Sequence, residues 1–252
     1  MHVLGMEMTA EVTTQLAQSE PALPEAVRAS TAIVIAAFNE AGCIASVVRE
    51  LRALSYPKVI VVDDGSPDAT AEEARLAGAT VLRHFVNRGQ GAALQTGITY
   101  AVAHGAEIIV TFDADGQHDA ADLPAMITPI TRGEVHICLG SRFLDKRPEM
   151  PWLRRLVLRA AVVFMRVTSR VKLTDAHNGF RAFSRQAAQS VDIQLDRMAH
   201  ASEIVDQFYQ SRLPYREIPV RIRYTEYSLR KGQRSSAALR VAFDYLLGRL
   251  TR

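Results

Sequence analysis

The feature that most constrains the fold is an alternation, between residues 32 and 110, of short β-type runs with segments of helical periodicity. The β-type runs are Ala32–Ala36, Val59–Val62, Thr80–Leu82 and Ile108–Val110. Between them, apolar residues recur every three or four positions, as they do in a helix that buries one face. This order is typical of parallel strands joined by right-handed crossovers. We therefore expect an α/β fold with a doubly wound, mostly parallel sheet flanked by helices.

Each expected strand is followed by polar residues. The polar clusters are Asn39-Glu40, Asp63-Asp64, Asn87-Arg88 and Asp113-Ala114-Asp115. Ligands of doubly wound sheets bind at the carboxyl ends of the strands, so these clusters are expected to share one edge of the sheet. Acidic clusters so placed repel one another unless a cation or hydrogen-bond donors lie between them. A functional site is therefore favoured over a set of capped turns.

Asp113 and Asp115 form the most informative of these clusters. Alternate residues of a strand share a face, so two carboxylates spaced in this way can converge on one point. Mg²⁺ is usually held by one or two carboxylates, with water and phosphate oxygens completing its shell. The pair predicts a metal–diphosphate site, to which the glycine-rich run 87–91 can add backbone N–H groups and Arg88. No Gly-x-Gly-x-x-Gly follows the first strand, which disfavours a Rossmann dehydrogenase.

Composition limits the classes of substrate and the cellular location that fit this site. The net charge of +3 and the pI near 9.0 fit a phosphate-bearing substrate or an anionic membrane surface and do not indicate nucleic acid. The two cysteines show no zinc spacing, residues 1–30 contain no apolar core of signal-peptide type, and no run is long enough for a membrane span. We expect a cytoplasmic protein. Its basic amphipathic helices at 153–171 and 236–252 are expected to pack on the core with their arginines in water, and peripheral contact with the inner face of the membrane is the alternative.

Six ordered segments resemble the family-two glycosyltransferases of A-type fold. They are Asn39-Glu40, Val61–Ser66, Asn87–Gly91, Asp113–His118, Gly140–Arg142 and Asn178–Arg181. The closest resemblance is to the dolichol-phosphate mannose synthase and polyprenyl-phosphate glycosyltransferase branch. It implies a nucleotide-diphospho-sugar transferase fold and an enzyme that transfers a hexose, with inversion, from a nucleotide-diphosphate sugar to a polyprenyl (dolichyl-type) phosphate. The transfer would take place at the cytoplasmic face of the membrane.

The resemblance also implies a role for each matching residue. The donor nucleotide would be bound by Ala37, Asn39, Glu40, Asp64, Arg88, Gly91, Asp113 and Ala114. Mg²⁺ or Mn²⁺ would be held by Asp113, Asp115 and Gln117, and the acceptor phosphate by Arg142 and Arg154. The catalytic candidates are Asp115, Arg142 and Asp175. The expected domain boundaries are a mobile leader at 1–30, the catalytic domain at 31–225, and a flexible segment with a C-terminal amphipathic helix at 226–252.

Two departures from the family pattern leave alternatives open. Leu158 stands where the lipid-phosphate branch commonly has serine, which puts the acceptor in question. A saccharide or protein hydroxyl acceptor would need a carboxylate base, for which Asp175 and Glu203 are candidates. Gln90 replaces a frequent lysine, and closure of a later segment with Arg230 or Lys231 could restore that charge. A non-catalytic nucleotide-sugar-binding or membrane-docking module ranks below both enzymes, and the sequence identifies neither sugar, nucleobase nor oligomeric state.

Overall fold

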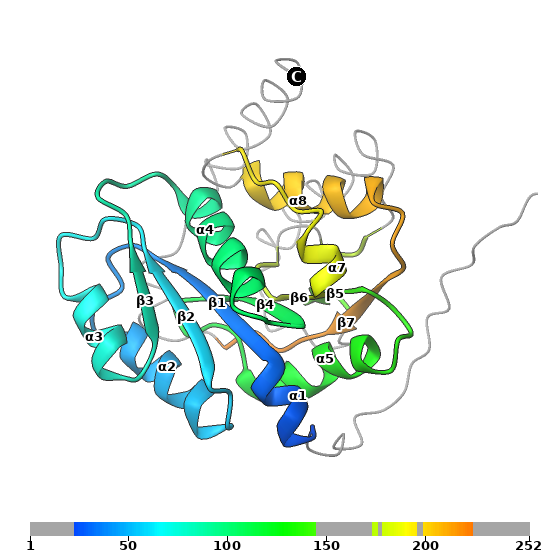
Figure 1. The fold of residues 1–252 in the computed structure, drawn as a ribbon, viewed down its shortest axis with the longest axis horizontal. Coiled ribbons are helices and arrows are strands. Elements are labelled where there is room, and N and C mark those ends of the chain that lie inside the picture. Colours follow the sequence, from blue (N-terminus) through cyan, green and yellow to red (C-terminus); the bar gives the residue numbers. More distant parts are fainter. Residues whose placement is uncertain (1–22, 145–172, 176–177, 196–198, 224–252) are drawn as a thin grey trace, which may run out of the picture.

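A seven-stranded sheet lies at the centre of the computed structural model, which describes residues 23–144, 173–175, 178–195 and 199–223 (Figure 1). The strand order is β3-β2-β1-β4-β6-β5-β7. The strands are β1 (Thr31–Ala37), β2 (Lys58–Asp63), β3 (Thr80–Arg83), β4 (Ile108–Asp113), β5 (Ile137–Ser141), β6 (Arg181–Ser184) and β7 (Tyr215–Pro219). The four strands expected from the alternating pattern are all present, each extended by one to three residues.

The sheet is parallel except for one strand. β1 pairs in parallel with β2 and β4, and β2 pairs in parallel with β3. β6 lies antiparallel between β4 and β5, and β7 pairs in parallel with β5 at the edge. The prediction of a doubly wound, mostly parallel sheet is confirmed. The sequence pattern did not reveal β6 and β7, which are short and contain charged residues.

Helices cover both faces of the sheet. The helices are α1 (Glu25–Ser30), α2 (Ile44–Ala53), α3 (Thr70–Leu76), α4 (Gln90–Ala103), α5 (Leu123–Thr131), α7 (Arg185–Ala188) and α8 (Ala199–Gln210), with a 3-10 turn at Ala120–Asp122. Buried residues of α2, α3 and α5 form one apolar cluster with the sheet, and those of α4, α7 and α8 form another. In Figure 1, α4, α7 and α8 lie together on the near face of the sheet.

The two clusters follow from the alternation of side chains along β1. Ile33 and Ile35 point into the α2 side, and Ala32 and Val34 point into the α4 side, all with no exposed surface. A strand buried on both faces has to be apolar at every position, which is why β1 reads as a continuous apolar run. The carboxyl ends of β1, β2 and β4 consequently meet at one edge of a rigid layer.

The chain before β1 differs in part from the expected leader. Glu25–Ser30 forms helix α1, and Leu23 is buried in the core. The hydroxyl of Thr31 donates to the carbonyl of Val27 at 2.8 Å and joins the helix to β1. The expected amphipathic helices at 153–171 and 236–252 and the candidate residues among them lie outside the described residues. These candidates are Arg154, Leu158, Arg230 and Lys231. In the described part of the chain, no helix has both the length and the apolar character to span a membrane.

Candidate active site

The carboxyl ends of three neighbouring strands gather the predicted acidic residues. Across the pairing of β1 with β2, Ala37 lies opposite Asp63, and across the pairing with β4, Ala36 lies opposite Asp113. Asp64 and the Asn39-Glu40 turn follow directly after β2 and β1. The structure thus brings the predicted donor-site residues to one edge of the sheet, as the positions of the polar clusters indicated.

Asp113 is the last residue of β4 and is enclosed by His118 and by the backbone of Gly179. Nε2 of His118 lies 2.8 Å from its Oδ2, and the backbone of Gly179 approaches its carboxylate so closely that a Cβ at residue 179 would lie 2.5 Å from Oδ1. Burial raises the pKa of Asp113, but His118, Arg181 and His200 outweigh it and hold that pKa below the ordinary value. Asp113 is therefore ionised near neutral pH.

Asp115 sits in a more negative environment. Burial and the charge of Asp113 raise its pKa above the ordinary value, and Glu40 adds to this rise. The backbone N–H of Gln117 donates to Asp115 Oδ1 at 3.0 Å, which orders the turn after β4. A divalent ion bound here would supply positive charge that offsets the repulsion of Asp115 by Asp113 and Glu40.

The donor set fits a divalent cation held largely by a substrate. Within the described residues, no group of three or more His, Cys, Asp or Glu side chains is arranged around one point. Mg²⁺ requires fewer protein ligands, because two carboxylates with waters and phosphate oxygens complete its octahedral shell. Asp113, Asp115 and Gln117 are the residues that would hold it.

His118 supports this turn from beneath. Its side chain is 3% exposed. The ring packs edge-on against Phe112 and at a tilt against Phe180, with ring centroids 5.1 Å apart in both pairs. The Gln117 carbonyl accepts the N–H of Arg223 at 2.7 Å, which ties the turn to the strip of chain after β7. Through these contacts His118 orders the turn that carries Asp115 and Gln117.

Asp64 holds the loop that follows β3. Its carboxylate accepts the backbone N–H groups of Arg88 and Gly89 at 2.9 and 2.7 Å, and Nδ1 of His84 lies 2.7 Å from Oδ1. Gly65 has a φ of +75°, and a Cβ there would lie 2.8 Å from the backbone of Val86. The glycine-rich loop is therefore docked on the end of β2, with Asp64 positioning it, and the expected contact of Asp64 with the nucleotide stays a prediction.

The Asn39-Glu40 turn is held by the loop after β2. The N–H of Asn39 donates to the hydroxyl of Ser66 at 3.0 Å, and that of Glu40 donates to Thr70 at 2.9 Å. Asn39 adopts the left-handed conformation, with a φ of +56°, which asparagine tolerates better than most residues. These bonds fix the turn at the end of β1, beside Asp115.

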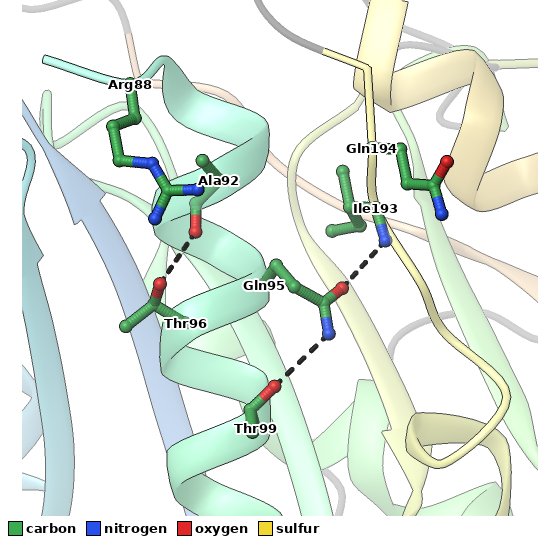
Figure 2. A pocket seen from close by; sticks show the side chains of 7 residues that line it. All are labelled: Arg88, Ala92, Gln95, Thr96, Thr99, Ile193 and Gln194. Atoms are coloured by element: carbon green, nitrogen blue, oxygen red, sulfur yellow. Dashed lines mark hydrogen bonds between the residues drawn. The ribbon is translucent and has the colours of Figure 1, made fainter.

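A groove of about 740 Å³ runs between α4 and the segment before α8 (Figure 2). It is lined by Arg88, Ala92, Gln95, Thr96, Thr99, Ile193 and Gln194. Gln95 bridges its two walls, because its Oε1 accepts the N–H of Ile193 at 2.7 Å and its Nε2 donates to Thr99 at 3.2 Å. Of the residues that line this groove, Arg88 is the charged one, and Figure 2 shows its side chain running along α4 toward Ala92.

Arg142 follows β5 and is held by Asp175. Its Nε and Nη2 donate to Oδ2 and Oδ1 of Asp175 at 2.6 and 2.8 Å, and its backbone N–H donates to the same carboxylate. The segment with Asp175 is fixed in turn, since Glu217 on β7 accepts the N–H groups of Thr174 and Asp175. Arg142 is thus presented in one orientation, two strands away from Asp113.

Arg181 is the site residue that sequence reasoning missed. It begins β6, lies opposite Thr111 of β4 and Leu139 of β5, and is 2% exposed. Burial lowers its pKa to about 10, against the opposing pull of Asp113 and Asp175, so it is charged at neutral pH. The resemblance included the segment 178–181, but nothing in the local pattern indicated that Arg181 faces two carboxylates from distant parts of the chain.

The comparisons with known proteins agree with this geometry. The model of glycosyl transferase family 2 matches residues 32–192. An uncharacterised protein of Methanocaldococcus jannaschii is 34% identical over 86% of this chain and 91% of its own. A UDP-N-acetylglucosamine–dolichyl-phosphate N-acetylglucosaminyltransferase of Methanococcus voltae is 30% identical over 85% of this chain and 94% of its own.

The solved structures agree on the fold. Glucosyl-3-phosphoglycerate synthase from Mycobacterium tuberculosis, in a complex with Mn²⁺, UDP-glucose and phosphoglyceric acid, has a TM-score of 0.65 and 22% identity, covering 88% of this chain and 82% of that one. The same synthase was also solved with Mg²⁺ and UDP. The family model covers more than half of the chain. The six segments that resemble the family, from Asn39 to Arg181, all lie within the matched residues. The chain is a glycosyltransferase and belongs to glycosyl transferase family 2.

Proposed function

We propose that the chain transfers a hexose, with inversion and with the help of a divalent cation, from a nucleotide-diphosphate sugar to a polyprenyl phosphate at the cytoplasmic face of the membrane. The observation that carries this proposal is Arg142, which Asp175 holds in a bidentate pair at the edge that also carries Asp113 and Asp115. A fixed guanidinium suits a phosphate, because its planar fork of N–H donors can bind two phosphate oxygens through parallel hydrogen bonds. Relatives named for transfer to dolichyl or undecaprenyl phosphate support the acceptor class.

On the donor side, Asp113 and Asp115 would hold Mg²⁺ or Mn²⁺ together with Gln117. When bound, the cation offsets the negative charge that builds on the departing diphosphate. The docked loop after β3 would place its backbone N–H groups and Arg88 near the donor, with Ala37, Gly91 and Ala114 close by. Asn39, Glu40 and Asp64 would set the position of the nucleoside.

On the acceptor side, the reaction needs positively charged side chains more than it needs a general base. A phosphate monoester carries about 1.5 to 2 negative charges at pH 7, so its oxygen attacks without losing a proton. Arg142, together with Arg154 from outside the described residues, would bring it to the sugar. Both oxygens of Asp175 accept N–H groups of Arg142, and Oε2 of Glu203 accepts those of Gln194 and Leu195. Because these oxygens already accept hydrogen bonds, the two carboxylates are poorly placed to act as general bases. This favours a phosphate acceptor over a hydroxyl acceptor.

The test compares two acceptors that differ only in the phosphate. The full chain is incubated with Mn²⁺, a panel of nucleotide-diphosphate sugars and either a short polyprenyl phosphate or the corresponding polyprenol, and product and free sugar are both measured. We expect transfer to the phosphate alone. Transfer to the polyprenol, with none to the phosphate, would overturn the proposed acceptor in favour of the hydroxyl alternative.

The metal site is tested in the same assay with Asp115→Asn. This change keeps the shape of the side chain and removes its charge, so we expect a loss of at least about 100-fold in kcat/KM, the size seen when one preorganised charge-stabilising group is removed. The matched control is Glu134→Gln, which lies at the opposite end of the sheet in a surface ion pair with Arg216. Equal activity of the two variants would contradict the metal role of Asp115.

A further inference from the structure

Arg181 carries a positive charge in the interior of the sheet, and its surroundings do not fully offset the free-energy cost of burying that charge. Among the described residues, neither Nη1 nor Nη2 has a hydrogen-bond partner, although both are fully buried. A buried charge without hydrogen bonds is strongly unfavourable, and an apolar side chain of similar volume is often the more stable choice at such a position. The charge of Arg181, rather than its volume, therefore requires an explanation.

The carboxylates that act on Arg181 belong to the two halves of the active site. One is Asp113, at the donor end of β4, and the other is Asp175, the partner of Arg142 on the acceptor side. β6 lies between β4 and β5, so Arg181 stands between these halves. Taken in the order of the strands from β5 through β6 to β4, the charges alternate in a row, from Arg142 with its partner Asp175, through Arg181, to Asp113.

We propose that Arg181 is a positioning residue that couples cation binding at Asp113 to phosphate binding at Arg142. The proposal rests on the proposed function. With Asp113 neutralised by a cation, Arg181 acts more strongly on Asp175. Asp175 then holds Arg142 less tightly, and Arg142 becomes a better partner for an acceptor phosphate. Coupling of this kind is reciprocal, so the phosphate also tightens the binding of the cation.

The same row of charges has a second, less intuitive consequence for the binding of the cation. Arg181 repels a cation at Asp113, because like charges oppose each other in a poorly screened interior. Removal of its charge therefore strengthens the binding of the cation alone while it weakens the coupling. A side chain that served only to pack β6 would give the opposite result, since its loss would loosen Asp113 and weaken the binding of the cation.

The experiment measures Mn²⁺ affinity of the full chain from the electron paramagnetic resonance signal of free Mn²⁺, with and without farnesyl phosphate. The variants are Arg181→Met, which removes the charge, and Arg181→Lys, which keeps it. The control is Phe183→Leu, a buried residue of the same strand that faces the same side of the sheet. Thermal unfolding of each variant shows whether it folds.

In the unsubstituted chain, farnesyl phosphate should tighten Mn²⁺ binding by about fivefold or more. In Arg181→Met, Mn²⁺ alone should bind at least about threefold more tightly, and the effect of farnesyl phosphate should fall below about twofold. Arg181→Lys should restore most of the coupling, and Phe183→Leu should change neither quantity. Weaker or unchanged Mn²⁺ binding in Arg181→Met would overturn the proposal. A chain that binds Mn²⁺ but not farnesyl phosphate would overturn the proposed acceptor and the coupling to it, while the Mn²⁺ affinities still decide whether Arg181 opposes the cation.

Discussion

Gly179 controls the position of Asp113, and its substitution by alanine tests the donor site without removing any charge. A Cβ at residue 179 would lie 2.5 and 2.7 Å from the two carboxylate oxygens of Asp113, whereas ordinary contacts of this kind begin at 3.4 Å. The carboxylate or the backbone of the segment at 178–180 must therefore move by about 0.9 Å, the difference between 3.4 and 2.5 Å.

The size of the effect follows from this displacement. Overpacking of a well-packed interior costs about 1–3 kcal/mol of unfolding free energy. A misplacement of about 1 Å in a catalytic constellation can lower the rate about 100-fold, which corresponds to about 2.7 kcal/mol of transition-state stabilisation. We therefore expect Gly179→Ala to remain folded, with kcat/KM lower by about 100-fold and Mn²⁺ affinity reduced.

Urea unfolding, sugar transfer and Mn²⁺ titration measure the three quantities. The control is Gly133→Ala. Gly133 also has a positive φ, of +69°, so alanine strains the backbone there, but its Cβ would meet nothing within 4 Å and residue 133 lies at the opposite end of the sheet. Both variants should lose stability, and only Gly179→Ala should lose activity and metal affinity. Full activity with full Mn²⁺ affinity in Gly179→Ala would refute the argument that Asp113 must occupy this place.

Two further predictions concern stability and thiol chemistry. Asp64→Asn places an amide N–H₂ against donors that the carboxylate now accepts, so the unfolding free energy in a urea titration should fall by about 1.5–3 kcal/mol, and an unchanged midpoint would contradict the role of Asp64 in docking the loop. Burial raises the pKa of Cys138 to about 12, so at pH 8 about one thiol in ten thousand is ionised. Iodoacetamide should therefore modify Cys138 only after unfolding, as peptide mass mapping can show, and rapid modification of the native protein would argue against its burial.

The features that could be predicted from the sequence are those with a local physical cause. β1 and β2 read as continuous apolar runs because both of their faces are covered, and the helices between strands carry their own periodicity. The rule that parallel strands end at one edge then brings Asp64 and Asp113 together without any knowledge of distances. For this reason the fold class, the gathering of acidic residues at one edge of the sheet and the family could be predicted from the order of the segments.

The sequence did not indicate the course of the chain after β5. β6 has four residues, Arg181–Ser184, too few for a period. It pairs antiparallel with β4, some 70 positions earlier in the chain, where Thr111 lies opposite Arg181. β7 contains two charged residues and a proline, which are uncommon in strands. Pairings of this kind depend on the packing of distant segments, and the sequence of either segment alone does not encode them.

The same division applies to individual residues. The sequence by itself determined which residue types stand at the ends of the strands, and hence that a cation and a diphosphate are the expected ligands. Only the tertiary structure decided that Asp64 docks a loop, that Asp175 is committed to Arg142, and that Arg181 lies buried between two carboxylates. The physical reason is that burial and charge pairing depend on contacts between residues far apart in the chain, whereas the pattern of a segment reports only its own exposure.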